Sequence, residues 1–273
     1  MREGPDSFYL VSAGAFQRLD HDWIRKHMPD DGSVRLQNLT GALGVLVIAG
    51  PRARELLQRV SDADLSNAAF PWLTGREIVV GLAPTRALRV NFVGELGWEL
   101  HHGLEYQNHI FDTLMEAGAD LGLAPFGIRA MDSMRVEKSY RLVGTELSIE
   151  YAAYESGLDR FVHPNKGEFI GRDALVRWRE RGFANRFVTL EVHDVTDADA
   201  LGNNPIYANG RLVGRATGGN YGFRVQKSLA LAMLHPAHAK PGTGLEMDIL
   251  GTRHPVTVIP ESPYDPENLK LRS

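Results

Sequence analysis

The chain has 273 residues, 43% of them hydrophobic and 23% charged, which is typical of a globular protein that forms one large or two medium domains. A net charge of −4 and a pI of about 6.2 argue against a nucleic-acid or anionic-membrane partner, and no segment reaches the roughly 20 apolar residues of a membrane helix. The absence of cysteine excludes thiol nucleophiles, disulfides and thiolate metal sites, so we expect a soluble protein of the reducing cytoplasm.

The first part of the chain mixes extended and helical patterns. Residues 7–12 ("SFYLVS") predict a strand, and residues 16–28 predict a helix with one apolar stripe. Residues 41–50 predict a buried strand, followed by a helix that begins near Pro51. From residue 77 to residue 101 the apolar period changes to two, so we expect strands with a turn at "VGEL".

Further helices are expected in the middle of the chain. Residues 104–117 predict one helix and residues 126–142 a second, on which Glu137 and Arg141 are spaced for an i,i+4 ion pair. Residues 171–182 predict a short helix closed by a glycine.

After about residue 184 the pattern is that of short alternating strands. Asn209-Gly210 is a typical type I′ hairpin turn between two of them. We therefore predict an α+β fold, with a mixed domain at 1–184 and a small β-barrel, or alternatively a sandwich, at 185–273.

Metal and phosphate motifs are weak in this sequence. His101 and His102 are adjacent, so on a strand they face opposite sides and cannot chelate one ion together, while His235 and His238 fall in a predicted loop. We expect these histidines to be solvated or at sheet edges, and we predict no metal site. The glycine-rich residues 216–222 lack the Lys-Ser/Thr of a P-loop and are interpreted as a wide turn in the barrel.

Glu99, in "VGELGWELHH", offers two acceptor oxygens side by side. The matching ligand is a planar edge with two adjacent donors, such as a guanidinium or the N3–H and 2-amino edge of a pterin or guanine. From the residues alone, an arginine partner or exposure to solvent is the favoured interpretation.

Several longer motifs change the interpretation of Glu99. "FVGELGWEL", "GIRAMDSMRVEKSYR", "GEFIGRDAL", "GGNYGFRVQKSLALAML" and "ESPYDPENLKLR" occur in this order. The chain resembles the folate-binding aminomethyltransferase (glycine cleavage T-protein) family over essentially its whole length. The pattern is most similar to the copy at the C-terminus of dimethylglycine and sarcosine dehydrogenases and oxidases.

The resemblance implies a tetrahydrofolate site with three residues of this chain. Glu99 matches the family glutamate that reads the pterin edge. Phe92 stands where the family usually has a tyrosine against the pterin, and Tyr264 lies close to a family tyrosine at the folate site.

One departure from the family pattern and one match to it lie on the predicted helix at 126–142. Met131 replaces an arginine that T-proteins use near the ligand, which argues against T-protein activity itself, although the dehydrogenase-associated copies tolerate an apolar residue there. Asp132 and Arg135 match the family's "DSLR"-type segment, and we interpret them as an ion pair that braces the helix.

The resemblance also implies a segment that this sequence lacks. Family members carry a Gly-Gly-Ile…Asp stretch upstream, whose aspartate is the usual catalytic carboxylate, so we expect an N-terminally truncated fold and assign no catalytic residue. The implied partner is a flavin-dependent amine dehydrogenase subunit. The alternative is a non-catalytic folate-binding or subunit-interaction protein. The iron–sulfur assembly branch is set aside, because "KGEFIGRDAL" stands where that branch has a cysteine motif.

Overall fold

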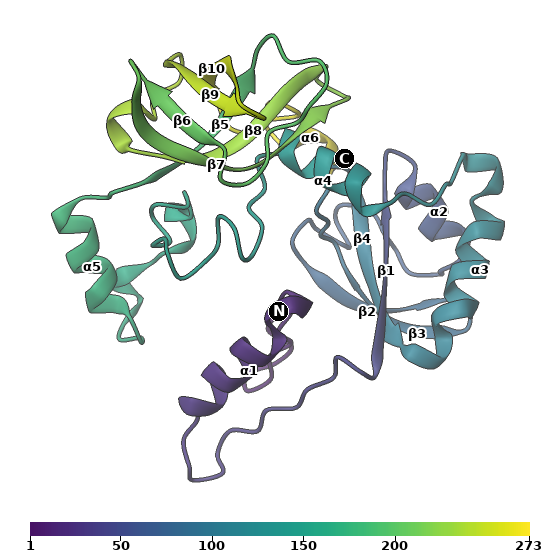
Figure 1. The fold of residues 1–273 in the computed structure, drawn as a ribbon. Helices are drawn as coiled ribbons and strands as arrows, with labels where there is room; N and C mark the ends of the chain where they lie inside the picture. The colour runs from purple at the N-terminus through teal and green to yellow at the C-terminus, as the bar shows by residue number, and fades with distance from the viewer. The chain divides into compact units, whose positions relative to one another are not determined.

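The computed structural model describes residues 1–273 (Figure 1). Contacts within the chain divide it into two compact units. The first unit consists of residues 1–91, 95–125 and 270–273, and the second of residues 92–94 and 126–269. The division at 1–184 and 185–273 stays a prediction about domains; the barrel strands themselves begin at Arg186.

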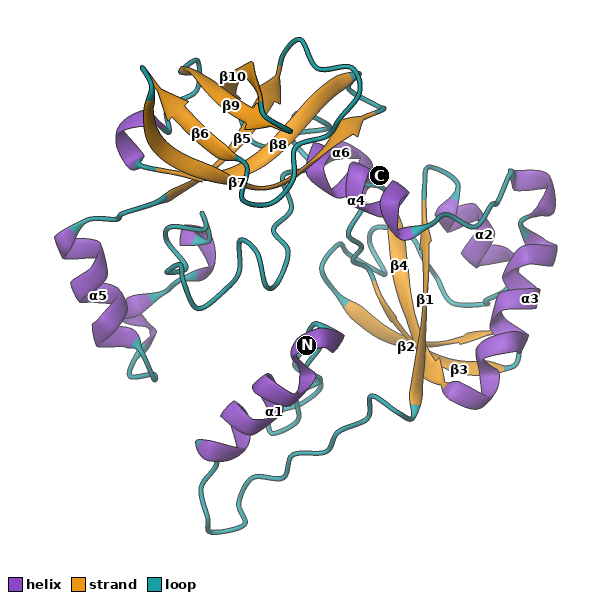
Figure 2. Ribbon diagram, in the orientation of Figure 1, coloured by secondary structure: helices purple, strands orange, loops and turns teal.

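The first unit is built on an antiparallel sheet with the strand order β1-β4-β3-β2 (Figure 2). The strands are β1 (Leu43–Ala49), β2 (Gly75–Val80), β3 (Ala83–Leu88) and β4 (Gly97–Gly103). The helical elements are η1 (Gly14–Phe16), α1 (Gln17–Lys26), α2 (Ala53–Arg59), η2 (Leu104–Tyr106), α3 (Gln107–Ala117) and η3 (Ala119–Leu121). The predicted helices at 16–28 and 104–117 are confirmed.

One face of this sheet forms the core of the first unit. Trp98 and Leu100 of β4 are fully buried there, together with Leu57 of α2 and Ile110 of α3. The opposite face is more open, since Val47 of β1 is 42% exposed. The predicted strand at 41–50 is therefore present, and it is buried on one side only.

The predicted strand at residues 7–12 is wrong. Phe8 forms only an isolated bridge with Arg2, and the Tyr9 amide donates to the Met1 carbonyl at 2.8 Å. The apolar residues of this segment have no ladder partner, because its backbone hydrogen bonds close within the first nine residues.

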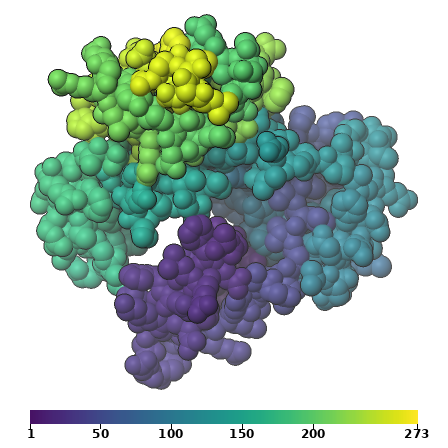
Figure 3. Space-filling model, in the orientation of Figure 1, coloured from purple at the N-terminus to yellow at the C-terminus, as the bar shows by residue number.

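The second unit contains a closed barrel with the strand order β10-β5-β8-β7-β6-β9, whose green to yellow atoms form one rounded body in Figure 3. Its strands are β5 (Arg186–Val192), β6 (Pro205–Ala208), β7 (Arg211–Gly222), β8 (Lys227–Leu234), β9 (Gly244–Ile249) and β10 (Thr252–Ile259). The helical elements are α4 (Ile128–Glu137), η4 (Asp159–Phe161), η5 (Pro164–Lys166), α5 (Arg172–Arg181) and η6 (Pro236–His238). The chain ends with α6 (Leu269–Arg272). The predicted α+β fold with a C-terminal barrel is confirmed.

Local turn chemistry explains part of the barrel. Asn209 and Gly210 both have positive φ, 49° and 75°, and join β6 to β7 as predicted. The wide turn expected at residues 216–222 is wrong, because these residues continue β7 and pair with β8. A Cβ at Gly219 would lie 2.7 Å from the Leu229 carbonyl oxygen, so this glycine permits a close strand contact.

Helix α4 packs against the barrel through polar contacts. The Ser133 hydroxyl donates to the Tyr221 carbonyl at 2.7 Å, and the Asn220 amide donates to Asp132 at 2.7 Å. These contacts fix α4 on β7 in the second unit. None of the helices has the combination of length and apolar character that a membrane crossing requires.

Candidate functional site

Strand β4 carries Glu99 on the sheet face opposite helices α2 and α3. Because side chains alternate along a strand, Trp98 and Leu100 enter the core, whereas Glu99 and His101 point to the other face. Glu99 lies opposite Val47 of β1 in the ladder. The predicted strand therefore presents Glu99 away from the apolar core.

Gly97 allows β4 to approach β1 closely just before Glu99. A Cβ at Gly97 would collide with the Ile48 carbonyl oxygen and would lie 3.0 Å from the Ala49 Cα atom. A glycine is therefore required here for steric reasons. It permits the close pairing of β4 with β1 two residues before the Glu99 carboxylate.

His101 joins Glu99 to the N-terminal segment. Its Nε2 atom lies 3.2 Å from Glu99 Oε2, and its Nδ1 atom lies 3.0 Å from the Tyr9 hydroxyl oxygen. The His101 side chain is 4% exposed and that of Glu99 is 25% exposed. The expectation of solvated or edge histidines is wrong for His101 and for His102, because both are buried, although they do face opposite sides of the sheet as expected.

Tyr9 is itself held by a charged neighbour. The Arg86 guanidinium stacks over the Tyr9 ring at 4.3 Å and pairs with Glu3 at 2.6 Å and Glu77 at 2.7 Å. Burial raises the pKa of the Tyr9 hydroxyl, and the positive charge of Arg86 opposes this effect in part. The hydroxyl therefore stays protonated at neutral pH and can donate a hydrogen bond.

Glu99 keeps acceptor capacity for a ligand. One of its oxygens contacts His101, and the other makes no hydrogen bond to the protein. A carboxylate in this state can accept two parallel hydrogen bonds from a planar edge with adjacent donors. Such an edge occurs on a guanidinium, a guanine or a pterin. Of the two interpretations favoured from the residues alone, the arginine partner is not found, and the Glu99 side chain is 25% exposed to solvent.

His101 and Tyr9 were not predicted from the sequence as part of this site. The signal for His101 was present, because the Glu-x-His spacing on a strand puts both side chains on one face. Tyr9 carried no such signal, since it comes from a segment 92 residues earlier in the chain.

Phe92 belongs to the second unit, whereas Glu99 belongs to the first. The Phe92 ring stacks on the ring of Tyr140, with centroids 5.9 Å apart and an angle of 23° between the planes. Burial raises the pKa of Tyr140, so the partner of Phe92 is a neutral aromatic ring at neutral pH. The two stacked rings, both half-buried, lie at the residue that the family resemblance assigns to the pterin.

Tyr264 also belongs to the second unit. The Arg224 guanidinium lies 3.7 Å from the centre of its ring, and the Tyr264 amide donates to the Glu137 carbonyl at 3.1 Å. The buried Lys138 ammonium donates to the Tyr264 carbonyl at 3.0 Å and to the Asp265 carbonyl at 2.7 Å. The predicted site residue is therefore fixed through its backbone by the end of α4.

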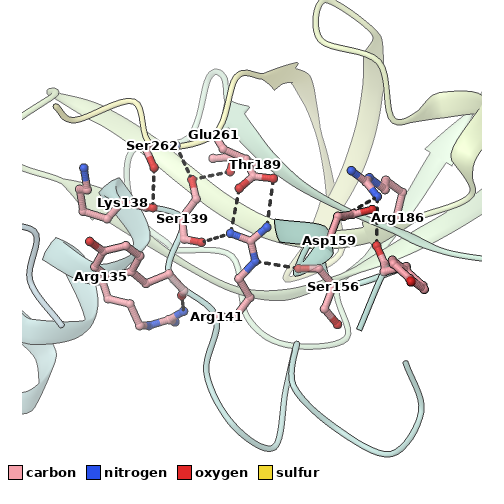
Figure 4. A network of polar contacts seen from close by, with 12 residues as sticks. Arg135, Lys138, Ser139, Arg141, Ser156, Asp159, Arg186, Thr189, Glu261 and Ser262 are labelled. Atoms are coloured by element: carbon pink, nitrogen blue, oxygen red, sulfur yellow. Dashed lines mark hydrogen bonds and ion pairs between the residues drawn. The ribbon is translucent and has the colours of Figure 1, made fainter. Parts of the chain in front are cut away.

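A polar network after α4 stabilises the segment that leads to Tyr264 (Figure 4). Ser139 adopts a left-handed conformation with φ 55°, and its hydroxyl lies 2.7 Å from Thr189 Oγ1 and accepts from the Ser262 amide at 2.8 Å. Arg141 donates to the Ser156 carbonyl at 2.8 Å and pairs with Glu261 at 2.8 Å. The network joins the end of α4, strand β5 and residues 261–262.

The other residues singled out on α4 have structural partners. Arg135 Nε donates to Asp132 Oδ1 at 2.6 Å, so the predicted ion pair is confirmed. The predicted pair between Glu137 and Arg141 is wrong, because α4 ends at Glu137 and Glu137 instead pairs with Arg224. Met131 is half-buried on the same helix. No group of three or more His, Cys, Asp or Glu side chains is placed to hold a metal ion.

A sheet covered by helices on one face, followed in the chain by a closed six-stranded barrel, is a fold that this chain shares with a solved aminomethyltransferase structure. The crystal structure of the glycine cleavage system aminomethyltransferase T from Bartonella henselae matches with a TM-score of 0.71 and 21% identity, over 82% of this chain and 60% of that one. The GCVT N-terminal domain family matches residues 1–166, and the glycine cleavage T-protein C-terminal barrel domain matches residues 185–265.

The chain belongs to the glycine cleavage T-protein family. Human mitochondrial dimethylglycine dehydrogenase is 36% identical over 261 residues, which is 95% of this chain and 30% of that protein. Mouse mitochondrial sarcosine dehydrogenase is 33% identical over 279 residues, with coverage of 98% and 30%. The chain thus spans 30% of the length of these relatives and is related to the corresponding part of them.

Proposed function

We propose that this chain binds tetrahydrofolate and acts, as part of a larger enzyme, in the transfer of a methylene unit from an N-methyl amine to the folate. The observation that carries the proposal is the Glu99 carboxylate, with one oxygen on His101 and the other without a hydrogen-bond partner in the protein. Phe92 and Tyr264, which belong to the second unit, are proposed from the family resemblance as further folate-binding residues. A cytoplasmic location belongs to the same proposal.

In the proposed reaction, oxidation of a dimethylglycine- or sarcosine-type amine by a flavin-dependent partner gives an iminium ion. The iminium transfers its methylene carbon to two nitrogen atoms of tetrahydrofolate, the demethylated amine leaves with one proton, and the second proton goes to solvent. Glu99 would orient the pterin by accepting from its 2-amino and N3–H groups. We assign the proton chemistry to no residue of this chain.

Replacing Glu99 by alanine is expected to weaken binding of a reduced folate by about 1.5–3 kcal/mol, or roughly 10- to 150-fold, as for a lost charge-assisted hydrogen-bond pair. Calorimetry with 5-formyltetrahydrofolate, which keeps the same pterin edge, measures the change in dissociation constant. Glu116→Ala, which removes an exposed carboxylate from α3, should leave the dissociation constant unchanged. Failure of the folded wild-type chain to bind the folate would sink the site assignment.

The alternative function is a non-catalytic folate-binding or partner-interaction subunit. We assign no proton-transfer residue in this chain, so this non-catalytic alternative is tested directly. We expect this chain, given formaldehyde and tetrahydrofolate, to form 5,10-methylenetetrahydrofolate no faster than the uncatalysed mixture does. Robust turnover would contradict this expectation and would show that the chain is sufficient for catalysis. Acceleration only after addition of a flavin-dependent amine dehydrogenase and its amine would support the larger-enzyme proposal.

A further inference from the structure

Glu99 is the end of a chain of hydrogen-bonding groups within the first unit. Tyr9, His101 and Glu99 are linked at 3.0 Å and 3.2 Å through the two ring nitrogens of the histidine. The Tyr9 ring meets the His101 ring edge-on, with centroids 5.6 Å apart and an angle of 85° between the planes. With both nitrogens bonded and the ring buried, rotation of His101 about its side-chain bonds is restricted.

The direction of each hydrogen bond follows from the chemistry of the ends. A carboxylate accepts only, so His101 Nε2 must carry the proton that points to Glu99. The Tyr9 hydroxyl stays protonated, because burial raises its pKa, and can therefore donate to Nδ1. The neutral imidazole with its proton on Nε2 satisfies both contacts at once.

The fold alone does not account for a histidine at this position. His101 lies on the face opposite the apolar core, between Val45 of β1 and Arg86 of β3 in the ladder. An aliphatic side chain could occupy such a position without a hydrogen-bonding requirement, whereas a buried imidazole is unfavourable unless both nitrogens find partners. Here both nitrogens do find partners, and one of them is the carboxylate with acceptor capacity left for a ligand.

We propose that His101 is a positioning residue for the ligand-binding carboxylate of Glu99. The Tyr9 hydroxyl fixes the tautomer of His101. The Nε2–H group of His101 then fixes the plane of the Glu99 carboxylate, so that its remaining acceptor sites face the donor edge of the ligand. This inference rests on the proposed folate function of Glu99. Tyr9 acts one step further back, and its own place is set by Arg86 with Glu3 and Glu77.

The test compares His101→Leu, His101→Gln and Tyr9→Phe in calorimetric titrations with 5-formyltetrahydrofolate. His101→Leu removes the donor to Glu99 and should raise the dissociation constant roughly 5- to 15-fold, while Tyr9→Phe should raise it roughly 2- to 5-fold. His101→Gln places an amide N–H near the position of Nε2 and should restore binding to within about threefold of wild type. His102→Gln alters the same strand from its other face, where the ring contacts Gln107, and should change stability without changing the dissociation constant.

A double-mutant cycle separates positioning from a merely structural role. Because His101 acts through Glu99, His101→Leu should have no further effect on binding in the Glu99→Ala background, so the two changes are not additive. Long-range proton–nitrogen NMR spectra of the unliganded protein should show the His101 proton on Nε2 in the wild type and a loss of that single tautomer in Tyr9→Phe.

The outcomes distinguish this proposal from the proposed function. Loss of binding in Glu99→Ala together with wild-type binding in folded His101→Leu overturns the positioning role alone. A proton on Nδ1 and not on Nε2 in the wild type also overturns it. Wild-type binding in Glu99→Ala overturns the folate site itself, and the positioning role with it.

Discussion

Glu137→Ala is expected to lower the free energy of unfolding by about 3–5 kcal/mol, as for a buried ion pair that loses one partner. Glu137 is 1% exposed, and its carboxylate accepts from the amides of Arg224 at 2.7 Å and Val225 at 3.2 Å as well as from the Arg224 guanidinium. The alanine variant leaves two amide donors and a guanidinium without this acceptor, at a position where the Arg224 side chain is only 19% exposed.

Urea denaturation of the wild type and the variant measures this change. Glu191→Ala is the matched control, because Glu191 pairs with Lys227 at 2.7 Å near the surface of the barrel and should contribute at most about 1 kcal/mol. Equal losses in the two variants would contradict the role given to Glu137. Since Arg224 also stacks on Tyr264, the Glu137 variant should additionally alter the environment of that ring, which NMR can follow.

The wrong prediction of an ion pair between Glu137 and Arg141 shows where i,i+4 spacing stops being informative on α4. Glu137 and Arg141 are four residues apart, but the helix ends at Glu137 and Ser139 turns the chain with φ 55°. Arg141 then pairs with Glu261, 120 residues away. A helical spacing rule holds only inside a helix, and the partners that replaced it come from segments distant in the chain. The pair between Asp132 and Arg135, inside the helix, was predicted correctly.

The site on β4 shows the same limit. Strand alternation correctly separates His101 from His102, because this property depends on the strand alone. Burial of His101 depends on Tyr9 and on the order β1-β4-β3-β2, and neither can be deduced from the local pattern. The turn at Asn209 and Gly210 was predictable for the opposite reason, since two residues with positive φ form it by themselves.

Trp98→Ala is expected to cost about 3–5 kcal/mol of unfolding free energy, because it removes the largest fully buried side chain next to Glu99. The Trp98 ring packs edge-on against Phe70, with centroids 6.1 Å apart, and the guanidinium groups of Arg89 and Arg54 lie 5.7 Å and 5.8 Å from its centre. The cavity would open on the core face of β4, directly behind the strand position that carries Glu99.

Thermal and urea unfolding test the size of the loss, and Trp23→Ala serves as the control, because Trp23 on α1 is 56% exposed and should change stability by less than about 1 kcal/mol. Trp98→Phe should cost less than the alanine change, since the ring is kept and the buried Nε1–H, which has no hydrogen-bond partner, is removed. A loss below 1 kcal/mol in Trp98→Ala would mean that the core face does not stabilise this strand. The expected result is that Trp98→Ala loses about 3–5 kcal/mol of stability while its folded fraction still binds the reduced folate. In that case the apolar face of β4 stabilises the strand, and the Glu99 face supplies the ligand contacts. Strand alternation keeps these two roles on opposite sides of the sheet.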